Sequence, residues 1–226
     1  MQMAPCCSLQ ATVFSDGKFC TEDFMVKKAL VLLADGFEEV EAITPIDYMR
    51  RAGIEVTVAA VGSGERLLIN GSHNIQVSAC AAMESLAAEG KLAPGDWDAV
   101  IVPGGLPGAD NLASSAEAGT FIKSMAAAGK LVASICASPA RVLSPLGLLT
   151  GKKFTCYPGQ EERVFQAGSA SPGAQLSQER VVIDGNVITS RGAGTAGEFS
   201  CAIIAYLTSE DEAKKLAEKL LLFGMV

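Results

Sequence analysis

The stretch KLVASICASPARVLSPL, residues 130–146, decides the fold that we expect for this chain. It opens with an apolar run at residues 131–135, which is typical of a strand buried on both faces. Cys136 follows at once, and Ser138 and Pro139 are residue types that commonly begin helices, one as N-cap and the other in the first turn. We therefore predict a strand, a sharp turn and a helix start, with the Cys136 thiol at the corner.

A thiol in such a turn has two interpretations. Backbone N–H groups at a helix start favour a thiolate and any oxyanion beside it, so Cys136 is a candidate nucleophile. The alternative is that Cys136 is a small buried hydrophobic residue, because free cysteine commonly has that role. The choice between the two depends on what the rest of the chain brings to the same place.

The composition fits one globular domain and excludes several functions. The chain has 226 residues, of which 49% are hydrophobic and 19% charged, enough for a full core. A net charge of -7, with no basic run interleaved with aromatics, argues against nucleic-acid binding. No apolar run is long enough to span a bilayer, so we expect no membrane association. The seven cysteines form no CxxC pair, so we expect no disulfide framework, no metal site and a reducing compartment.

The chain divides into two parts. Residues 1–25 lack hydrophobic periodicity and the apolar core of a signal peptide, so we predict a disordered N-terminal extension followed by a single domain over residues 26–226. A cytoplasmic location is the expectation. The alternative is an organellar one, in a chloroplast or mitochondrion, with the extension as an untypical targeting segment.

Strands and helices are predicted to alternate along the domain. Buried strands are expected at residues 29–34, 54–60, 98–102, 131–135 and 153–157, and helices at 38–52, 83–88, 117–128, 198–207 and 209–222. Two hairpins are expected, one with a two-residue turn at Asn70-Gly71 and one around residues 184–186. This order predicts an α/β three-layer sandwich on a mostly parallel sheet.

Chemically useful residues follow several of these strands. The carboxyl ends of parallel strands line the ligand crevice of such sheets. Four features fall there: the acidic helix start at residues 38–41, the backbone donors of Gly104-Gly105, Cys136, and the glycine-rich loop after Arg191. The loop lacks the Lys-Ser/Thr of a P-loop, which disfavours nucleotide binding. The glutamates could simply complement the helix dipole, but the convergence favours a functional Cys136.

Five segments together resemble the ThiJ/PfpI superfamily, and within it the branch of the Parkinson disease protein deglycase. They are GFEEVE (36–41), PIDYMRRAG (45–53), VPGG (102–105), ASICASP (133–139) and TSRGAGT (189–195). The resemblance covers residues 27–223. It implies a flavodoxin-like homodimer with a nucleophile elbow, in which Cys136 is the nucleophile and Glu41 the paired carboxylate. It also implies a cofactor-free glyoxalase that converts methylglyoxal to lactate, a deglycase for early glyoxal adducts on proteins, or an oxidation sensor with chaperone activity.

The residues suggest how such a reaction would run. A Cys136 thiolate, ionised at neutral pH, would attack the aldehyde of a 2-oxoaldehyde, and backbone N–H groups of Gly104, Gly105 and Ala137 would meet the oxyanion. Glu41, kept protonated by burial, would move a proton between the two carbons. Further contacts are expected in the pocket or at the dimer interface. They are Glu38, Arg51, His73, Tyr157 and Arg191.

Two positions depart from the pattern of the branch. Tyr157-Pro158 stands where a His-Pro step is common, and His73 stands where many members have arginine. His73 is the single histidine and none follows Cys136, so a Cys-His protease mechanism is not expected. The main alternative is a non-enzymatic redox sensor or redox-regulated chaperone, in which Cys136 is oxidised to a sulfinate beside protonated Glu41. A third alternative is a purely structural dimeric scaffold.

Overall fold

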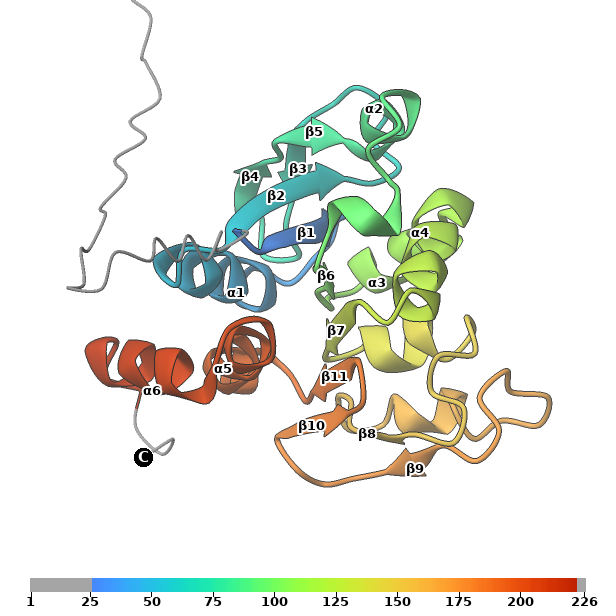
Figure 1. Cartoon of the computed structure of the whole chain (residues 1–226). Helices are drawn as coiled ribbons and strands as arrows, with labels where there is room; N and C mark the ends of the chain where they lie inside the picture. The colour runs from blue at the N-terminus through green and yellow to red at the C-terminus, as the bar shows by residue number, and fades with distance from the viewer. Residues whose placement is uncertain (1–25, 223–226) are drawn as a thin grey trace, which may run out of the picture.

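Seven strands form one sheet in the order β10-β11-β7-β6-β1-β2-β5 (Figure 1). The computed structural model describes residues 26–222, so the predicted N-terminal extension lies outside the described residues. All neighbouring strands pair in parallel except β10 and β11, which form an antiparallel hairpin. The strands of this sheet are β1 (Lys28–Leu33), β2 (Glu55–Ala60), β5 (Ala81–Ala82), β6 (Ala99–Val102), β7 (Leu131–Ile135), β10 (Val181–Asp184) and β11 (Val187–Ser190).

Helices cover both faces of this sheet. The α-helices are α1 (Glu39–Arg51), α2 (Met83–Ala88), α3 (Gly108–Ser114), α4 (Ala116–Ala127), α5 (Ala196–Leu207) and α6 (Glu210–Lys219). Two short strand pairs lie outside the main sheet: β3 (Leu68–Asn70) with β4 (Gln76–Ser78), and β8 (Lys153–Phe154) with β9 (Gln175–Leu176). In residues 26–222, no helix combines the length and the apolar character that crossing a bilayer requires.

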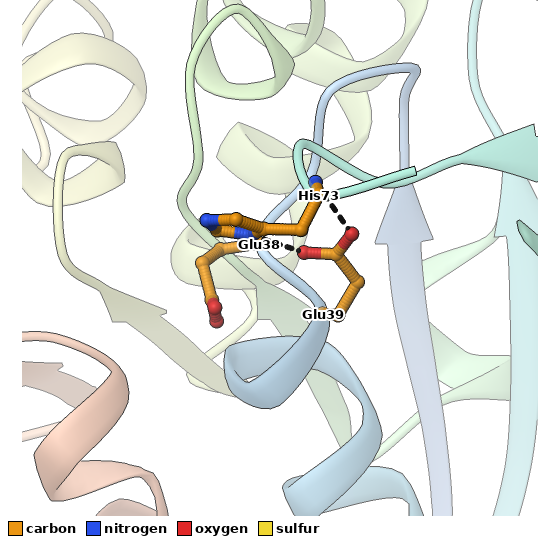
Figure 2. A group of neighbouring side chains, drawn as sticks. All are labelled: Glu38, Glu39 and His73. Atoms are coloured by element: carbon orange, nitrogen blue, oxygen red, sulfur yellow. Dashed lines mark hydrogen bonds and ion pairs between the residues drawn. The ribbon is translucent and has the colours of Figure 1, made fainter. Parts of the chain in front are cut away.

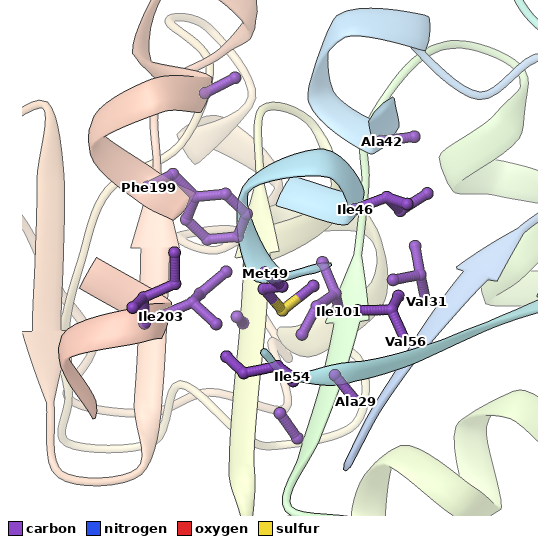
Figure 3. Close-up of a cluster of buried hydrophobic side chains, with 14 of the residues drawn as sticks. Ala29, Val31, Ala42, Ile46, Met49, Ile54, Val56, Ile101, Phe199 and Ile203 are labelled. Carbon is purple, nitrogen blue, oxygen red and sulfur yellow. The ribbon is translucent and has the colours of Figure 1, made fainter. Parts of the chain in front are cut away.

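The two cores follow from the alternation of side chains along each strand. In β1, Val31 points into a cluster with side chains of α1 and α5, including Met49 and Phe199 (Figure 3). Its neighbour Leu32 points into a second cluster, on the face that α2 and α4 cover. Because both faces are buried, β1 reads as a continuous apolar run. The predicted three-layer, flavodoxin-like α/β sandwich is therefore confirmed.

Several local predictions were wrong in detail. A helical segment does begin at Pro139 with Ser138 at the N-cap position, as predicted, but it is a five-residue π-helical turn, Pro139–Leu143. The side chain of Ser138 makes no capping hydrogen bond, because its hydroxyl donates to the carbonyl of Pro103 at 2.6 Å. The Asn70-Gly71 turn is also wrong: Asn70 pairs with Gln76 inside the hairpin, so the loop is residues 71–75. The last helix ends at Lys219, and α3 was not predicted.

The carboxyl ends of β1, β6, β7 and β11 meet at one edge of the sheet, as their parallel pairing requires. The chain segments that follow them are the acidic start of α1, the Gly104-Gly105 loop, Cys136 and the glycine-rich loop before α5. The predicted convergence of these four segments therefore holds, and it places the candidate site.

Candidate active site

Cys136 occupies a strained corner directly after β7. Its φ is +65°, a left-handed conformation that costs a non-glycine residue roughly 1–2 kcal/mol. The surrounding backbone holds it there: the N–H of Cys136 donates to the carbonyl of Ser190 at 2.9 Å, and its carbonyl accepts from the N–H of Tyr157 at 2.8 Å. The thiol is thus presented at the sheet edge, in the geometry of the predicted nucleophile elbow.

Glu41 lies in the first turn of α1 and is 1% exposed. Its Oε2 accepts from the backbone N–H of Gly104 at 3.0 Å, and the N–H of Ala193 also faces the carboxylate. The carboxyl group lies next to Cys136, and the two groups affect each other's pKa. A Cβ built on Gly104 would lie 2.6 Å from both Oε2 of Glu41 and Cβ of Cys136. Only glycine at this position lets the acid and the thiol meet.

Burial and neighbouring negative charges set the protonation of this pair. Burial, aided by the charge of Glu38, raises the pKa of Glu41 to about 7, against the stabilising contacts from Cys136 and Gly104. Burial and the neighbouring Glu41 likewise raise the pKa of Cys136. The prediction of a thiol that is ionised at neutral pH is therefore not supported while Glu41 carries a charge. A thiolate requires that the proton shared by the pair reside on Glu41.

The backbone donors differ from those predicted in one respect. The N–H groups of Gly105 and Ala137 face the sulfur of Cys136 and favour its ionised form. The N–H of Gly104 instead donates to Oε2 of Glu41 at 3.0 Å. Gly105 has a φ of +91°, and a Cβ there would overlap the backbone N of Glu38.

Of the other predicted contact residues, some lie near Cys136 and Glu41 and others lie away from them. Tyr157 lies beside the site, since a Cβ on Gly192 would be 3.3 Å from its ring and 3.8 Å from Oε1 of Glu41. Arg191 turns to Gln178, donating to its side chain at 2.7 Å. Arg51 pairs with Asp47 at 2.7 Å on the surface of α1. It lies ten residues after Glu41, about 15 Å along the helix, so it does not line this site within one chain.

Glu38, Glu39 and His73 form a group at the start of α1 (Figure 2). Glu38 caps the helix, because its Oε2 accepts from the N–H of Glu41 at 2.7 Å. Nδ1 of His73 lies 2.9 Å from Oε2 of Glu39, and this contact raises the pKa of the exposed imidazole. The three side chains could offer ligand atoms to a metal ion, since these atoms lie within 4.8 Å of one another. The hydrogen bonds of Glu39 already account for the arrangement.

Two contributors to the site were not foreseen from the sequence. The backbone N–H of Ala193 faces Glu41 and lowers its pKa, a role that no residue type signals. Thr195 holds the loop before it: its hydroxyl contacts that of Ser190 at 2.6 Å and accepts from the N–H of Gly192 at 3.1 Å. The glycine-rich composition of residues 192–197 was the available sign that backbone groups would act there.

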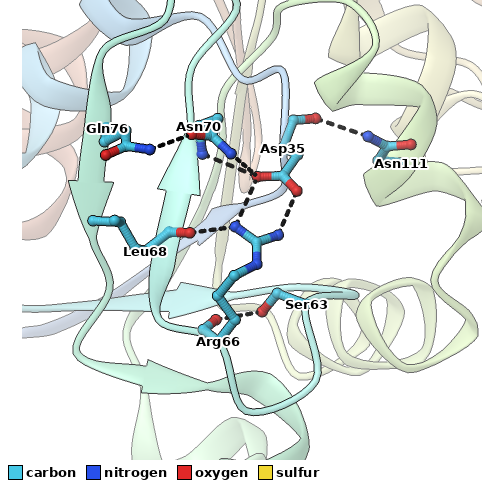
Figure 4. A network of polar contacts seen from close by, with 7 residues as sticks. All are labelled: Asp35, Ser63, Arg66, Leu68, Asn70, Gln76 and Asn111. Atoms are coloured by element: carbon cyan, nitrogen blue, oxygen red, sulfur yellow. Dashed lines mark hydrogen bonds and ion pairs between the residues drawn. The ribbon is translucent and has the colours of Figure 1, made fainter.

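A polar cleft of about 380 Å³ lies apart from Cys136, lined by Asp35, Val61, Gly62, Asn111, Ser114 and Ser115. Its polar side chains are already hydrogen-bonded within the chain, and Figure 4 shows the bonds of Asp35 and Asn111. Asp35 accepts from the guanidinium of Arg66 and from the N–H of Asn70, and Asn111 donates to the carbonyl of Asp35 at 2.7 Å. The chemistry that the sequence predicts therefore belongs to Cys136 and not to this cleft.

Comparison with known proteins agrees with this geometry. The sequence profile of the DJ-1/PfpI family matches residues 27–206. The chain belongs to the DJ-1/PfpI family. This confirms the resemblance to the ThiJ/PfpI superfamily inferred from the five segments.

Individual relatives span most of this DJ-1/PfpI chain. The protein dj-1beta of Drosophila melanogaster is 37% identical over 87% of this chain and 98% of its own. A deglycase of Pyrococcus abyssi is 35% identical over 74% of this chain and 91% of its own. Among solved structures, oxidized DJ-1 of Toxoplasma gondii superposes with a TM-score of 0.78 at 35% identity, covering 88% of this chain and all of its own.

Proposed function

We propose that this protein is a cofactor-independent glyoxalase and deglycase, which converts methylglyoxal or glyoxal, free or as early protein adducts, to 2-hydroxy acids. The observation that supports it is the meeting of a strained thiol and a buried carboxyl group of raised pKa across Gly104. A relative named as a deglycase supports the same activity.

The first step would use Glu41 as a base. With a pKa of about 7, its carboxylate accepts the proton of the Cys136 thiol as the sulfur attacks the aldehyde carbon. A carbon–sulfur bond forms, and the carbonyl oxygen becomes an oxyanion facing the N–H groups that already favour a charge at this corner, those of Gly105 and Ala137. Glu41 then gives this proton to the oxyanion, which completes the hemithioacetal and restores the carboxylate.

The second step would move hydrogen between the two substrate carbons. Glu41 takes the proton from the former aldehyde carbon and returns it to the adjacent carbon, while the hydroxyl proton on the former aldehyde carbon moves to the oxygen of the adjacent carbon. The intermediate is an enediol and the product is a thioester. Water then cleaves the carbon–sulfur bond, which releases a 2-hydroxy acid and restores the thiol. The net change is addition of one water to the 2-oxoaldehyde, so no redox cofactor is consumed. A carboxyl group with a pKa near 7 suits both transfers.

Direct assay tests this function. Purified protein is incubated with methylglyoxal in the absence of glutathione, and lactate is measured for the wild type, Cys136→Ser and Glu41→Gln. We expect lactate from the wild type alone, with all three proteins folded by circular dichroism. If Cys136→Ser produces lactate at the wild-type rate, the covalent mechanism is wrong. If Glu41→Gln does so, Glu41 is not the proton shuttle.

A redox sensor is the second candidate. Oxidation of the thiol by peroxide to a sulfinate would place two oxygens near the N–H groups of Gly105 and Ala137, with protonated Glu41 as a further donor. The similar Toxoplasma gondii structure is described as oxidized. If peroxide adds two oxygens to Cys136 in the wild type while methylglyoxal yields no lactate, the sensor is favoured.

We also infer a homodimer. Val40 and Ile43 on α1 are 48% and 40% exposed, and Ile75 in the hairpin loop is 58% exposed. Exposed apolar side chains of this size favour burial against a second copy. Light scattering coupled to size-exclusion chromatography is expected to give twice the mass of the chain. A monomer at micromolar concentration would contradict this.

A further inference from the structure

Glu39 is a buried carboxylate that the proposed reaction does not use. It begins α1 and is 5% exposed. Its Oε1 accepts from the N–H of His73 at 2.7 Å, and its Oε2 lies 2.9 Å from Nδ1 of His73 (Figure 2). Oε1 also accepts from the N–H of Ile75 at 3.4 Å, and Oε2 accepts from the hydroxyl of Ser72 at 3.2 Å. A carboxylate tolerates burial only with such a set of partners, and all of them come from the hairpin loop, residues 71–75.

The hairpin loop is shaped to the carboxylate. A Cβ built on Gly71 would overlap Oε1 of Glu39. The φ of Gly71 is not in the left-handed region, so its backbone does not by itself require glycine. Glycine is needed here because the carboxylate approaches so closely. The contact therefore fixes the loop against the start of α1.

The hairpin loop and its neighbours in turn hold residues 36–38. The N–H of Gly36 donates to the carbonyl of Asn70 at 2.7 Å, and the N–H of Ser72 donates to the carbonyl of Phe37 at 2.8 Å. Phe37 and Gly71 also form a parallel bridge. Residues 36–38 thus lie between the hairpin loop on one side and the Gly104-Gly105 loop on the other.

The same three residues pack directly on the backbone donors of the active site. The N–H of Glu38 donates to the carbonyl of Gly104 at 3.0 Å, and the carbonyl of Gly36 accepts from the N–H of Gly108 at 3.1 Å. A Cβ on Gly105 would overlap the backbone of Glu38, so residues 36–38 and the Gly104-Gly105 loop are in close contact. The N–H groups of Gly104 and Gly105 are those that face Glu41 and Cys136.

We propose that Glu39 is a positioning residue, which acts through the hairpin loop and residues 36–38 to hold the N–H groups of Gly104 and Gly105 against Glu41 and Cys136. This role rests on the site of the proposed function. Its consequence, a change in the reactivity of the Cys136 thiol, can be measured without assaying that function. Loss of the contact loosens the donors that stabilise the thiolate, and the thiolate is the form that reacts with alkylating agents.

Glu39→Gln tests this by alkylation of the full-length protein with iodoacetamide between pH 6 and 10, with modification of Cys136 followed by peptide mass spectrometry. The amide keeps one acceptor for the N–H of His73 but replaces the other oxygen with a donor. We expect the rate at Cys136 to fall at least about threefold at pH 8, while exposed Cys80 in the same sample reacts as before. Removal of a negative charge alone would act in the opposite direction, because it favours the thiolate and raises the rate.

Gly71→Ala supplies a second, independent variant. Its methyl group displaces the Glu39 carboxylate but keeps its charge, so positioning predicts the same fall in rate and a purely electrostatic role predicts none. Asp35→Asn is the matched control: it removes a carboxylate that binds the outer part of the hairpin through Arg66 and Asn70. We expect it to leave the Cys136 rate unchanged.

The outcomes separate cleanly. Unchanged or faster alkylation in both Glu39→Gln and Gly71→Ala overturns the proposal, as does an equal fall in Asp35→Asn, which would mean that any loosening of the hairpin suffices. If alkylation of Cys136 slows in both variants while the wild-type protein makes no lactate, the positioning role is upheld and the glyoxalase function is rejected.

Discussion

The backbone N–H of Gly104 donates to Oε2 of Glu41 at 3.0 Å, and the hydrogen that replaces its side chain leaves the space in which that carboxyl group meets the Cys136 thiol. Gly104 therefore both donates a hydrogen bond to the acid and leaves room for the acid to approach the thiol. The acid, the thiol and the donor come from α1, β7 and the segment after β6, so their meeting depends on the parallel order of the sheet.

Gly104→Ala is expected to lower the rate of the proposed reaction at least about 100-fold and to destabilise the fold by roughly 1–3 kcal/mol. The reason is that its Cβ would lie 2.6 Å from Cys136 and from Glu41, and neither the strained corner nor the buried helix start can retreat. Lactate production and urea unfolding measure the two effects. Gly95→Ala is the control, since a Cβ there meets nothing within 4 Å, and equal losses in both variants would contradict the explanation.

Glu41→Gln is expected to change how stability depends on pH. The pKa of Glu41 is raised from 4.5 to about 7, so the folded state binds this proton more tightly than the unfolded chain does. The stability that it contributes is fully present below about pH 4.5 and is lost as pH rises through about 7, a fall of about 3 kcal/mol at most. The glutamine variant lacks this fall.

Urea unfolding of the wild type and Glu41→Gln at pH 4, 6 and 8 measures the difference. We expect the variant to gain stability relative to the wild type between pH 4 and 8. Glu84→Gln, at an exposed position on α2, provides the matched comparison. Parallel pH curves for the wild type and Glu41→Gln would show that the carboxyl group does not titrate as its burial implies.

The strain at Cys136 predicts an unusual response to glycine. Replacing alanine with glycine inside a helix costs about 1 kcal/mol, as we expect for Ala202→Gly in α5. At Cys136, with a φ of +65°, relief of the left-handed strain offsets that cost. We therefore expect Cys136→Gly to be at least as stable as Cys136→Ala by thermal unfolding. A loss of about 1 kcal/mol relative to alanine would mean that the corner is unstrained.

Much of this arrangement could be predicted from the sequence because it depends on patterns of residue type. Apolar runs such as residues 131–135 fixed the buried strands, and their alternation with helices fixed the parallel sheet. The parallel order then implied that Cys136, the acidic helix start at residues 38–41 and Gly105 share one edge, and the family resemblance singled out Glu41. Peripheral residues such as Arg51 and Arg191 were placed less well, because they bind Asp47 and Gln178 instead.

What could not be predicted depends on directions of individual bonds. Ser138 has the composition of an N-cap, but its hydroxyl found a buried carbonyl across the turn. Asn70-Gly71 has the composition of a tight turn, but Asn70 pairs with Gln76, and Gly71 begins a longer loop that packs against the carboxylate of Glu39. The raised pKa of Cys136 depends on its degree of burial, which no residue pattern specifies.

The hydroxyl of Ser138 offers the last test, because the chain contains its natural control. Ser138 and Ser134 are both fully buried, but Oγ of Ser138 donates to the carbonyl of Pro103 at 2.6 Å, whereas Oγ of Ser134 has no partner among residues 26–222. Ser138→Ala is expected to cost about 1–3 kcal/mol, since it breaks a buried bond next to Gly104. Ser134→Ala is expected to be neutral or stabilising, because it removes a hydroxyl already desolvated without compensation. Urea midpoints distinguish the two, and equal destabilisation would show that both effects come from lost packing and not from the hydrogen bond that holds the Pro103-Gly104 step against the nucleophile.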